Sequence, residues 1–520
     1  MSAYDALPYG GSAVPLSHPD RLASAAIRAG RSAADPARAR IVELGCGEGA
    51  NLIPMAYHLP ESELLGVDAS AGEIEIGEEA RARLGLDNVT FRQADILELD
   101  AKALGEVDFL IVHGVFSWVG DAVRARILEL ARDALSPNGL LYLSYNCAAG
   151  WALKAEMRAL LLHHTAGLDA MEEKVRVMRE LLTLLSSSPL REASLHAAAL
   201  GERAERALES RDAYLVHEYL SPDNRAFRHR EVVELAGAHG LAFVDELASV
   251  TAHPSLEDTL ARGLRSRFDD PVEVADVADT MLGRPFRTSL FARAGAVAPE
   301  ADPQRVAASL CFRGRLRPKA TRFSLEPDVA ETFVGAGDEQ IVVRPSRLKA
   351  ALVELARAYP LALPFDAVME RAGMLLELRR VRVDAHDQAE VAADLLELVR
   401  LEHLAASPRA PRVAFEVSST PRVEALTRLE AERGPVVTSP HHELCVLDPF
   451  ARLLVRYLDG ARARDELVER MSVHLERGEV VAWDPEGAPP EGEARQAAVS
   501  ELIAQRLTVL RDAGLLSDAG

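Results

Sequence analysis

The chain has few cysteines and lacks any long apolar run. Its four cysteines show neither Cys-x-x-Cys spacing nor the density of a disulfide scaffold, so we expect reduced thiols and no metal site. No apolar stretch approaches the roughly 18 residues that span a bilayer, and the opening MSAYDALPYG lacks the basic-then-apolar layout of a signal peptide. These absences predict a cytoplasmic protein that is not inserted in a membrane.

Basic residues are also in deficit. With 59 Lys and Arg against 80 Asp and Glu, the formal net charge is -21. Basic residues do not cluster locally, so the chain would repel a phosphate backbone and we expect no nucleic-acid partner. The 520 residues, of which 48% are hydrophobic, suffice for about three globular domains.

Strand and helix patterns alternate from residue 40 to residue 146. Short apolar runs in RIVELG, ELLGVDAS, NVTFRQAD, VDFLIVHG and GLLYLSYN are separated by helical patterns such as ANLIPMAYHL and GEIEIGEEARARLG. This alternation is typical of right-handed βαβ units, so we predict an α/β fold with a doubly wound, mostly parallel sheet. Ligands of such sheets bind at the carboxyl ends of the strands.

The rhythm breaks at residues 150–228, which are rich in Leu, Ala, Glu and Arg and predict a helical insertion. The α/β pattern then resumes, is interrupted again around 253–283, and ends at the Ala/Pro-rich linker 295–304. Between Val381 and Leu404 six acids face two arginines, which favours a module for protein contacts over one that binds DNA. The expected parts are a core at 1–149, the insertion (a lid or dimerisation element) at 150–228, the end of the core at 229–295, a winged-helix-like domain at 305–410 and an α-rich domain at 411–520.

The stretch VELGCGEGANL carries a glycine loop directly behind a predicted strand. Gly45, Gly47 and Ala50 satisfy G-x-G-x-x-[G/A], a pattern that dinucleotide sites also use. A pyrophosphate at the helix N-terminus would, however, lie close to Glu43 and Glu48. S-adenosylmethionine has no phosphate, and its sulfonium and ammonium outweigh its one carboxylate. The acidic glycine loop therefore favours S-adenosylmethionine.

Carboxylates follow three successive strands. Glu43 ends the first, Asp68 the second, where it can accept from both ribose hydroxyls, and Asp95 the third, where it can accept from the adenine amino group. Each alone is equally explained as a helix or turn cap, but together they form a constellation that predicts a cofactor site. The expected cofactor-binding residues are Glu43, Gly45, Cys46, Gly47, Asp68, Ala69, Asp95, Ile96, His113, Gly114 and Val115.

Seven stretches of the sequence resemble a known bacterial family. They are YDALPY, HPDRLA, ELGCGEGANLIPMA, HGVFSWV, SYNCAAGW, HEYL and FRTSLFARAG, and they are similar to the class I protein-lysine methyltransferases that modify bacterial outer-membrane proteins. The resemblance implies a seven-stranded methyltransferase sheet, a regulatory region, a winged-helix-like C-terminal domain, a protein lysine as acceptor and a homodimer. One departure bears on the acceptor pocket: Cys147, Ala148 and Ala149 stand where the family usually has Thr-Tyr-Pro.

The acceptor site is expected after the fourth and fifth strands. His113 is either a proton acceptor or a residue that holds the loop by hydrogen bonds, and Tyr145 and Asn146 either orient the acceptor or cap a strand end. We take His113, Tyr145 and Asn146 as the candidate catalytic residues. Tyr4, Tyr9 and His18 precede the first strand, in a segment that in class I enzymes often folds over the cofactor. The pair His217 and Glu218 in HEYL has no partner at metal spacing, so no metal is predicted.

Three functions remain open at this stage. The first is a protein-lysine methyltransferase, the second a methyltransferase acting on a small molecule, and the third a binding protein that senses S-adenosylmethionine without chemistry. In the first case we expect residues 40–146 to hold the cofactor, and the insertion at 150–228 and the region beyond 304 to select the acceptor.

Overall fold

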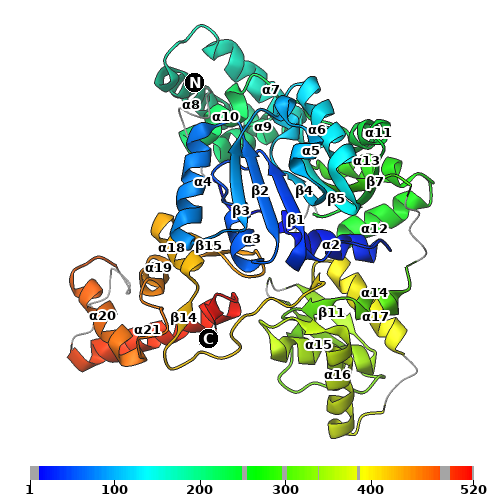
Figure 1. Ribbon diagram of the computed structural model, residues 1–520, viewed down its shortest axis with the longest axis vertical. Helices are drawn as coiled ribbons and strands as arrows, with labels where there is room; N and C mark the ends of the chain where they lie inside the picture. Colours follow the sequence, from blue (N-terminus) through cyan, green and yellow to red (C-terminus); the bar gives the residue numbers. More distant parts are fainter. Residues whose placement is uncertain are drawn as a thin grey trace.

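A computed structural model describes residues 11–248, 254–295, 301–335, 337, 339–382, 387–480 and 492–517. Its centre is a seven-stranded sheet in the order β3-β2-β1-β4-β5-β7-β6. The strands are parallel except β7, which is antiparallel to both its neighbours. This confirms the predicted doubly wound sheet (Figure 1). The strands are β1 Arg40–Leu44, β2 Glu63–Asp68, β3 Val89–Gln93, β4 Val107–Val112, β5 Leu135–Asn146, β6 Leu241–Glu246 and β7 Phe286–Arg293.

Helices cover both faces of this sheet because its strands are apolar on both sides. Ile41 points into a core with helices on one face, and the next residue, Val42, points into the core on the other. The first face packs against α2 Pro19–Arg28, α3 Leu52–His58 and α4 Ala71–Leu84, and the second against α5 Ala101–Leu104, α6 Asp121–Ala134 and α11 His229–Ala238.

The predicted insertions are helical. The first has a small core of its own, with Met157, Leu161, Met178 and Leu182 buried between its helices. Its helices are α7 Ala148–Thr165, α8 Met171–Ser186, α9 Leu195–Leu208 and α10 Asp212–Leu220; the second insertion holds α12 Pro254–Arg265 and α13 Pro271–Leu282.

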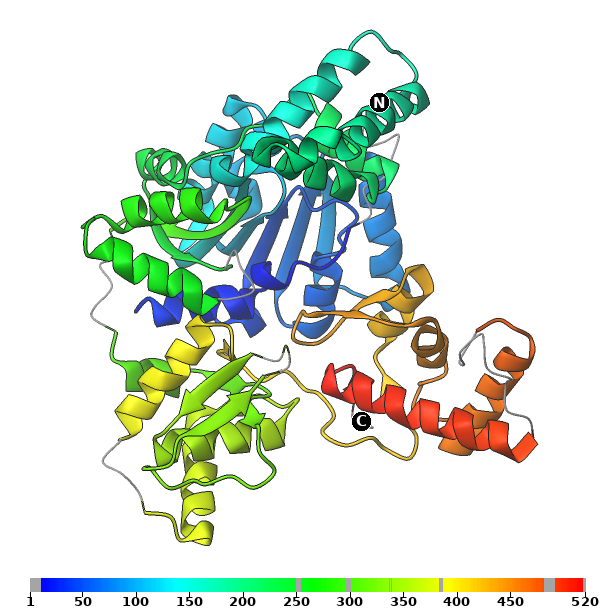
Figure 2. The same ribbon diagram turned by 180° about the vertical axis from the view of Figure 1, so that it is seen from behind.

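The rest of the chain forms two lobes on one side of the sheet domain (Figures 1 and 2). The middle lobe has a core that runs from Val306 to Leu404, and the C-terminal lobe a separate core from Ala414 to Leu516. The helices of the middle lobe are α14 Pro303–Ala308, α15 Ser346–Ala358, α16 Phe365–Arg379 and α17 Gln388–Arg400. Those of the C-terminal lobe are α18 Ala425–Arg433, α19 Pro449–Val455, α20 Arg464–Glu476 and α21 Gly492–Asp512, with a hairpin of β15 Val436–Thr438 and β16 Leu444–Val446.

The C-terminal lobe packs against the sheet domain. Leu426 and Leu429 of α18 are buried in the same core as α2 and α3, and Tyr57 donates a hydrogen bond to Glu424 at 3.0 Å. The C-terminal lobe is therefore packed directly against the cofactor side of the sheet domain and is not merely tethered to it.

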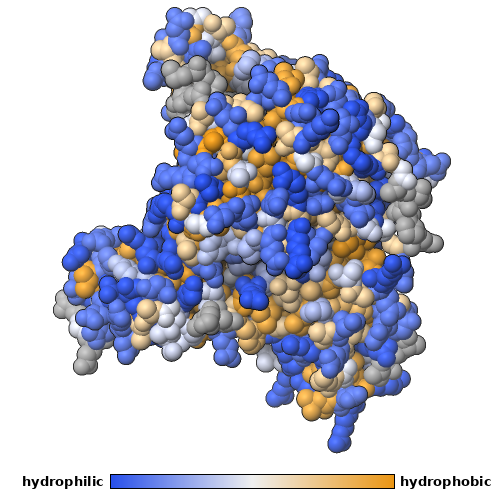
Figure 3. Space-filling model, viewed as in Figure 1, coloured by the Kyte–Doolittle hydropathy of each residue, from blue (hydrophilic) through white to orange (hydrophobic). Residues whose placement is uncertain are grey.

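The surface is mostly hydrophilic, with apolar side chains over the central strands beside α4 (Figure 3). Within the described ranges no helix is long and apolar enough to cross a bilayer.

Candidate cofactor and acceptor site

The glycine loop follows β1, and its conformation and close packing require glycine at position 45. Gly45 has φ +76°, a conformation that residues with a side chain rarely adopt, and a Cβ at this position would collide with Val115. The amides of Gly45 and Cys46 donate to the carbonyl of Val67 at 2.8 and 3.1 Å, which ties the loop to β2. The loop is thus fixed in place by β2 and by Val115.

Glu43 is a buried carboxylate at the start of this loop. It is 3% exposed; its Oε1 accepts from Asn51 Nδ2 at 2.9 Å, while its Oε2 is buried with no hydrogen-bond partner among the described residues. Burial raises the pKa of Glu43 to about 8, and the nearby Asp68 adds to this. A buried acceptor without a donor is costly unless a ligand supplies one, so the site fits a cationic group such as an ammonium.

Asp68 is the last residue of β2, and Asp95 lies directly before a short 3-10 helix. Asp68 accepts from the backbone amides of Gly47 and Ser70, both at 2.9 Å, and therefore holds the glycine loop. Each of its oxygens keeps a lone pair for a ribose hydroxyl. Asp95 is exposed and caps the 3-10 helix by accepting from Leu97 N at 2.9 Å. The capping interpretation therefore holds for Asp95 in this structure, and its contact with adenine stays a prediction, as does that of its half-buried neighbour Ile96.

The residues after β4 are fixed by hydrogen bonds to β5. Nδ1 of His113 lies 3.0 Å from the hydroxyl of Tyr142, and the amide of Gly114 donates to Ser144 Oγ at 2.8 Å. Burial lowers the pKa of His113 to about 4, so the imidazole is neutral at physiological pH. This geometry supports the loop-holding role of His113; its role as proton acceptor stays a prediction.

Tyr145 and Asn146 end β5 but point to different surroundings. Tyr145 is 1% exposed, and its hydroxyl is hydrogen-bonded to His229 Nδ1 at 2.8 Å and Ser289 Oγ at 3.1 Å. Its hydroxyl is thus engaged inside the core. Asn146 Nδ2, by contrast, is buried and has no hydrogen-bond partner in the described parts of the chain. Of the two predicted residues, Asn146 has the polar group that is left for a ligand.

An aromatic cluster surrounds an ammonium group beside these strand ends. The rings of Trp118 and Trp151 are 5.8 Å apart, and Lys154 Nζ lies 4.4 Å above the Trp151 ring and within 6 Å of two tyrosine rings. Lys154 also forms an ion pair with Glu218. The sequence stretches HGVFSWV, SYNCAAGW and HEYL supply Trp118, Trp151 and the pair Glu218 and Tyr219, but nothing in their spacing indicated that these residues meet around Lys154. The two tyrosines within 6 Å of Lys154 Nζ are Tyr214 and Tyr219.

The segment before α2 crosses the glycine loop. The amide of Gly11 donates to Glu48 Oε1 at 2.8 Å, and that of Val14 donates to Asn51 Oδ1 at 2.8 Å. His18 is buried, and its Nδ1 caps α2 by accepting from Asp20 N at 3.2 Å. Tyr4 and Tyr9 lie outside the described residues.

Asn51 connects this segment, Glu43 and the C-terminal lobe, and the sequence analysis missed it. Its Nδ2 donates to Glu43 and to Ser17 Oγ, both at 2.9 Å. Its Oδ1 lies 2.8 Å from Nε2 of His442, which is 391 residues away in the chain. No local sequence signal could have found this partner.

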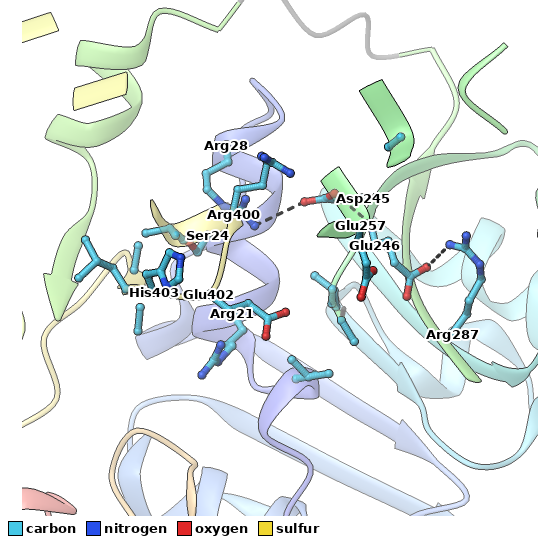
Figure 4. Close-up of a pocket in the computed structure, with 18 of the residues that line it drawn as sticks. Arg21, Ser24, Arg28, Asp245, Glu246, Glu257, Arg287, Arg400, Glu402 and His403 are labelled. Atoms are coloured by element: carbon cyan, nitrogen blue, oxygen red, sulfur yellow. Dashed lines mark hydrogen bonds and ion pairs between the residues drawn. The ribbon is translucent and has the colours of Figure 1, made fainter. Parts of the chain in front are cut away.

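A cavity of about 800 Å³, lined by both charged and apolar side chains, lies between the sheet domain and the middle lobe. Figure 4 shows Arg28 of α2 paired with Asp245 of β6, and Glu246 of β6 paired with Arg287 of the neighbouring strand β7. The glycine loop, Asp68 and Asp95 are not among the described residues that line it. Nor do the described residues bring three His, Cys, Asp or Glu side chains together in a way that would hold a metal. The cofactor site must therefore be identified from the strand ends rather than from the cavity.

The sheet order, the glycine loop after β1 and the carboxylates at the ends of β1 and β2 define a class I methyltransferase, which uses S-adenosylmethionine as its methyl donor. Models of three domains match the chain: a methyltransferase domain at 36–181, a predicted methyltransferase regulatory domain at 211–293 and a PKMT C-terminal winged helix domain at 419–515. The chain belongs to the bacterial methyltransferase family that joins these three domains. The winged-helix match lies in the C-terminal lobe, whereas the helical spacing in the sequence predicts this domain at 305–410.

Similar proteins come from Rickettsia. The uncharacterized protein RP789 of Rickettsia prowazekii is 25% identical over 485 residues, which cover 92% of this chain and 87% of the relative. The uncharacterized protein RP028 of the same organism is 31% identical over 234 residues, 45% of this chain and 93% of the relative. The solved structure of PKMT2 from Rickettsia typhi in complex with AdoHcy has the same fold, with a TM-score of 0.82 at 21% identity, covering 98% of this chain and 100% of that one.

Proposed function

We propose that the protein transfers methyl groups from S-adenosylmethionine to lysine side chains of a protein acceptor. The observation that carries the proposal is the aromatic cluster beyond β4 and β5. A primary ammonium, that of Lys154, already lies on the face of Trp151 beside Trp118 and Glu218. Cation–π and carboxylate contacts of this kind recognise alkylammonium groups, so the mouth of the site suits a lysine acceptor. The match to a PKMT winged-helix model supports the same acceptor class.

The residues at the strand ends fit the cofactor. The Glu43 carboxylate would take the ammonium of the methionine part, and the backbone of Gly45, Cys46 and Gly47 would lie against it. Asp68 would accept from the ribose hydroxyls, next to Ala69. Asp95, Ile96, His113, Gly114 and Val115 would border the adenine and the methionine chain. The cofactor supplies a methyl group on a sulfonium, which is an activated leaving group.

The chain's own residues mainly align the acceptor amine and exclude water, because displacement at the methyl carbon needs in-line geometry rather than an activated nucleophile. Asn146 Nδ2 is buried, finds no partner among the residues that the structure describes and would orient a polar group of the acceptor. Neutral His113 keeps the loop after β4 in place through Tyr142. Tyr145, whose hydroxyl is hydrogen-bonded inside the core, would act indirectly by supporting the neighbouring Asn146. The amine must lose one proton, and we assign the role of its acceptor to the neutral imidazole of His113.

The parts of the chain divide the work in this proposal. Residues 1–149 and 229–295 form the methyltransferase core, the insertion 150–228 covers the acceptor side, and the regions 305–410 and 411–520 recognise the acceptor protein. The insertion exposes Leu184, Leu190 and Leu195 at 66%, 62% and 92%, which supports a homodimer that buries them. We place the enzyme in the cytoplasm, without a nucleic-acid partner.

The experiment that tests the acceptor uses the full chain and methyl-labelled S-adenosylmethionine. An unfolded lysine-rich outer-membrane protein is offered in native form and with its lysines acetylated, beside small amines and carboxylic acids. We expect label in the native protein only, recovered as methyllysine after hydrolysis. Label confined to the small molecules would show a small-molecule methyltransferase, and cofactor binding without any label would show a sensor.

A further inference from the structure

A turn of the C-terminal lobe reaches the cofactor side of the sheet domain. It links β15 and β16, and Figure 2 shows this orange segment extending to the blue helices beneath the sheet. His442 in this turn is 1% exposed. Its Nε2 lies 2.8 Å from Oδ1 of Asn51, the residue before α3, and its ring lies against that of His18, with centroids 4.9 Å apart.

The hydrogen bonds of Asn51 determine which group donates in this contact. The backbone amide of Val14 can only donate, so the Asn51 atom 2.8 Å from it must be the oxygen. The amide nitrogen of Asn51 therefore faces Glu43 and Ser17. It follows that His442 donates from Nε2. Burial lowers the pKa of His442 to about 3, so the ring is neutral and carries its proton on that nitrogen.

The backbone at His442 is held in an unfavourable conformation. Its φ is +59°, in the left-handed region that residues with a Cβ rarely adopt and that persists only where the surroundings impose it. Glu443, the next residue, forms ion pairs with Arg313 of the middle lobe and, at 3.5 Å, with Arg21 of α2. The turn is thus fixed from both sides with the imidazole facing Asn51.

We propose that His442 is a positioning residue of the methyltransferase site: the C-terminal lobe holds Asn51, and through Asn51 the carboxylate Glu43, in the orientation that receives the cofactor. This inference rests on the proposed role of Glu43 toward the cofactor ammonium. The C-terminal lobe, which is proposed to recognise the acceptor, thereby also becomes part of the cofactor site. Acceptor binding and cofactor binding are then linked.

The proposal predicts a specific pattern of cofactor affinities in the full-length chain. His442→Ala should weaken the binding of S-adenosylhomocysteine about fivefold, which is the change in affinity that corresponds to one buried hydrogen bond of ordinary strength. His442→Gln, which keeps a donor, should recover part of this. Asn51→Ala should weaken binding at least as much, and the double variant no more than Asn51→Ala alone, because both changes remove the same link. His441→Ala is the matched control, since His441 lies in the same turn but packs beside Gly514.

Titration calorimetry from pH 6 to 9 adds a measurement that a loss of packing alone would not change. Glu43 is faced by Asn51, Asp68, Cys46 and Tyr142, and the hydrogen bond from Asn51 lowers its pKa. When Asn51 is released, the half-point of affinity against pH should move upward in His442→Ala and stay in place in His441→Ala. Melting temperatures, recorded in parallel, identify variants that fail to fold, and His442→Gln then serves in place of His442→Ala.

The results separate this inference from the proposed cofactor site. If Asp68→Ala loses affinity while His442→Ala and His442→Gln stay within twofold of the wild type, or if the effects of His442→Ala and Asn51→Ala multiply, the positioning role is refuted and the cofactor site stands. If wild-type protein fails to bind S-adenosylhomocysteine, the cofactor site itself is refuted.

Discussion

Replacing Glu43 with Gln should separate two effects of this buried acid, which are its pH-dependent cost to folding stability and its contribution to cofactor binding. Burial raises the folded-state pKa of Glu43 from 4.5 to about 8, so between these values the folded chain binds a proton that the unfolded chain does not. Stability contributed by Glu43 is therefore greatest at low pH and is lost as pH rises through about 8. From pH 6 to pH 8 the loss is on the order of 2 kcal/mol. Gln mimics the protonated acid and carries no such dependence.

The assay compares urea unfolding of wild type and Glu43→Gln at pH 6 and pH 8, followed by the fluorescence of Trp118 and Trp151, two of the three tryptophans. Other raised carboxyls, such as Glu430 with a pKa of about 7, affect both proteins equally and cancel in the difference. We expect the variant to gain about 2 kcal/mol relative to wild type between the two pH values, and to lose at least tenfold in affinity for S-adenosylhomocysteine. A difference between the proteins that does not change with pH would refute the reasoning.

Three further changes test the site. Asp68→Ala should weaken the binding of S-adenosylhomocysteine at least about tenfold, because a lost buried acceptor typically costs about 1.5–3 kcal/mol. An unchanged affinity in calorimetry would contradict the proposed contact of Asp68 with the ribose hydroxyls. S-adenosylhomocysteine should raise the melting temperature through mass action while NAD and NADP should not, and stabilisation by NAD alone would reverse the choice of ligand. His113→Gln should lower the methylation rate without moving its pH midpoint between pH 5.5 and 7.5, since burial holds the pKa of His113 near 4; loss of a limb near pH 6.5 would instead show that His113 titrates during turnover.

Local patterns were enough to predict the sheet. The alternation of strands and helices predicted the strands of the sheet, and the glycine positions around Gly45 predicted a tight loop after β1, because both depend on residues close together in the sequence. Strand-end carboxylates followed from the same rule, since parallel strands place their ends along one edge.

Contacts between distant parts of the chain were not predictable in this way. Tyr145 was expected to orient the acceptor or to cap a strand end, and its hydroxyl is engaged in the core by residues 84 and 144 positions away. Nor did any local pattern indicate that Asn51 Oδ1 accepts hydrogen bonds from Val14 and His442. A hydrogen-bond partner on a separate lobe leaves no periodicity in the sequence around it.

The hydrogen bond between Asn51 and His442 has a consequence for the order of events during synthesis. The ribosome must add 391 residues after Asn51 before its partner exists, which at about 5–20 residues per second takes about 20–80 s. The sheet domain can fold in that interval, since domains generally fold as units while the chain is made. Its cofactor loop nevertheless stays incomplete until the last lobe has emerged and docked. A nascent or truncated chain would therefore hold S-adenosylmethionine less tightly than the finished enzyme, and the methyl donor would be bound fully only by chains that also carry the C-terminal lobe.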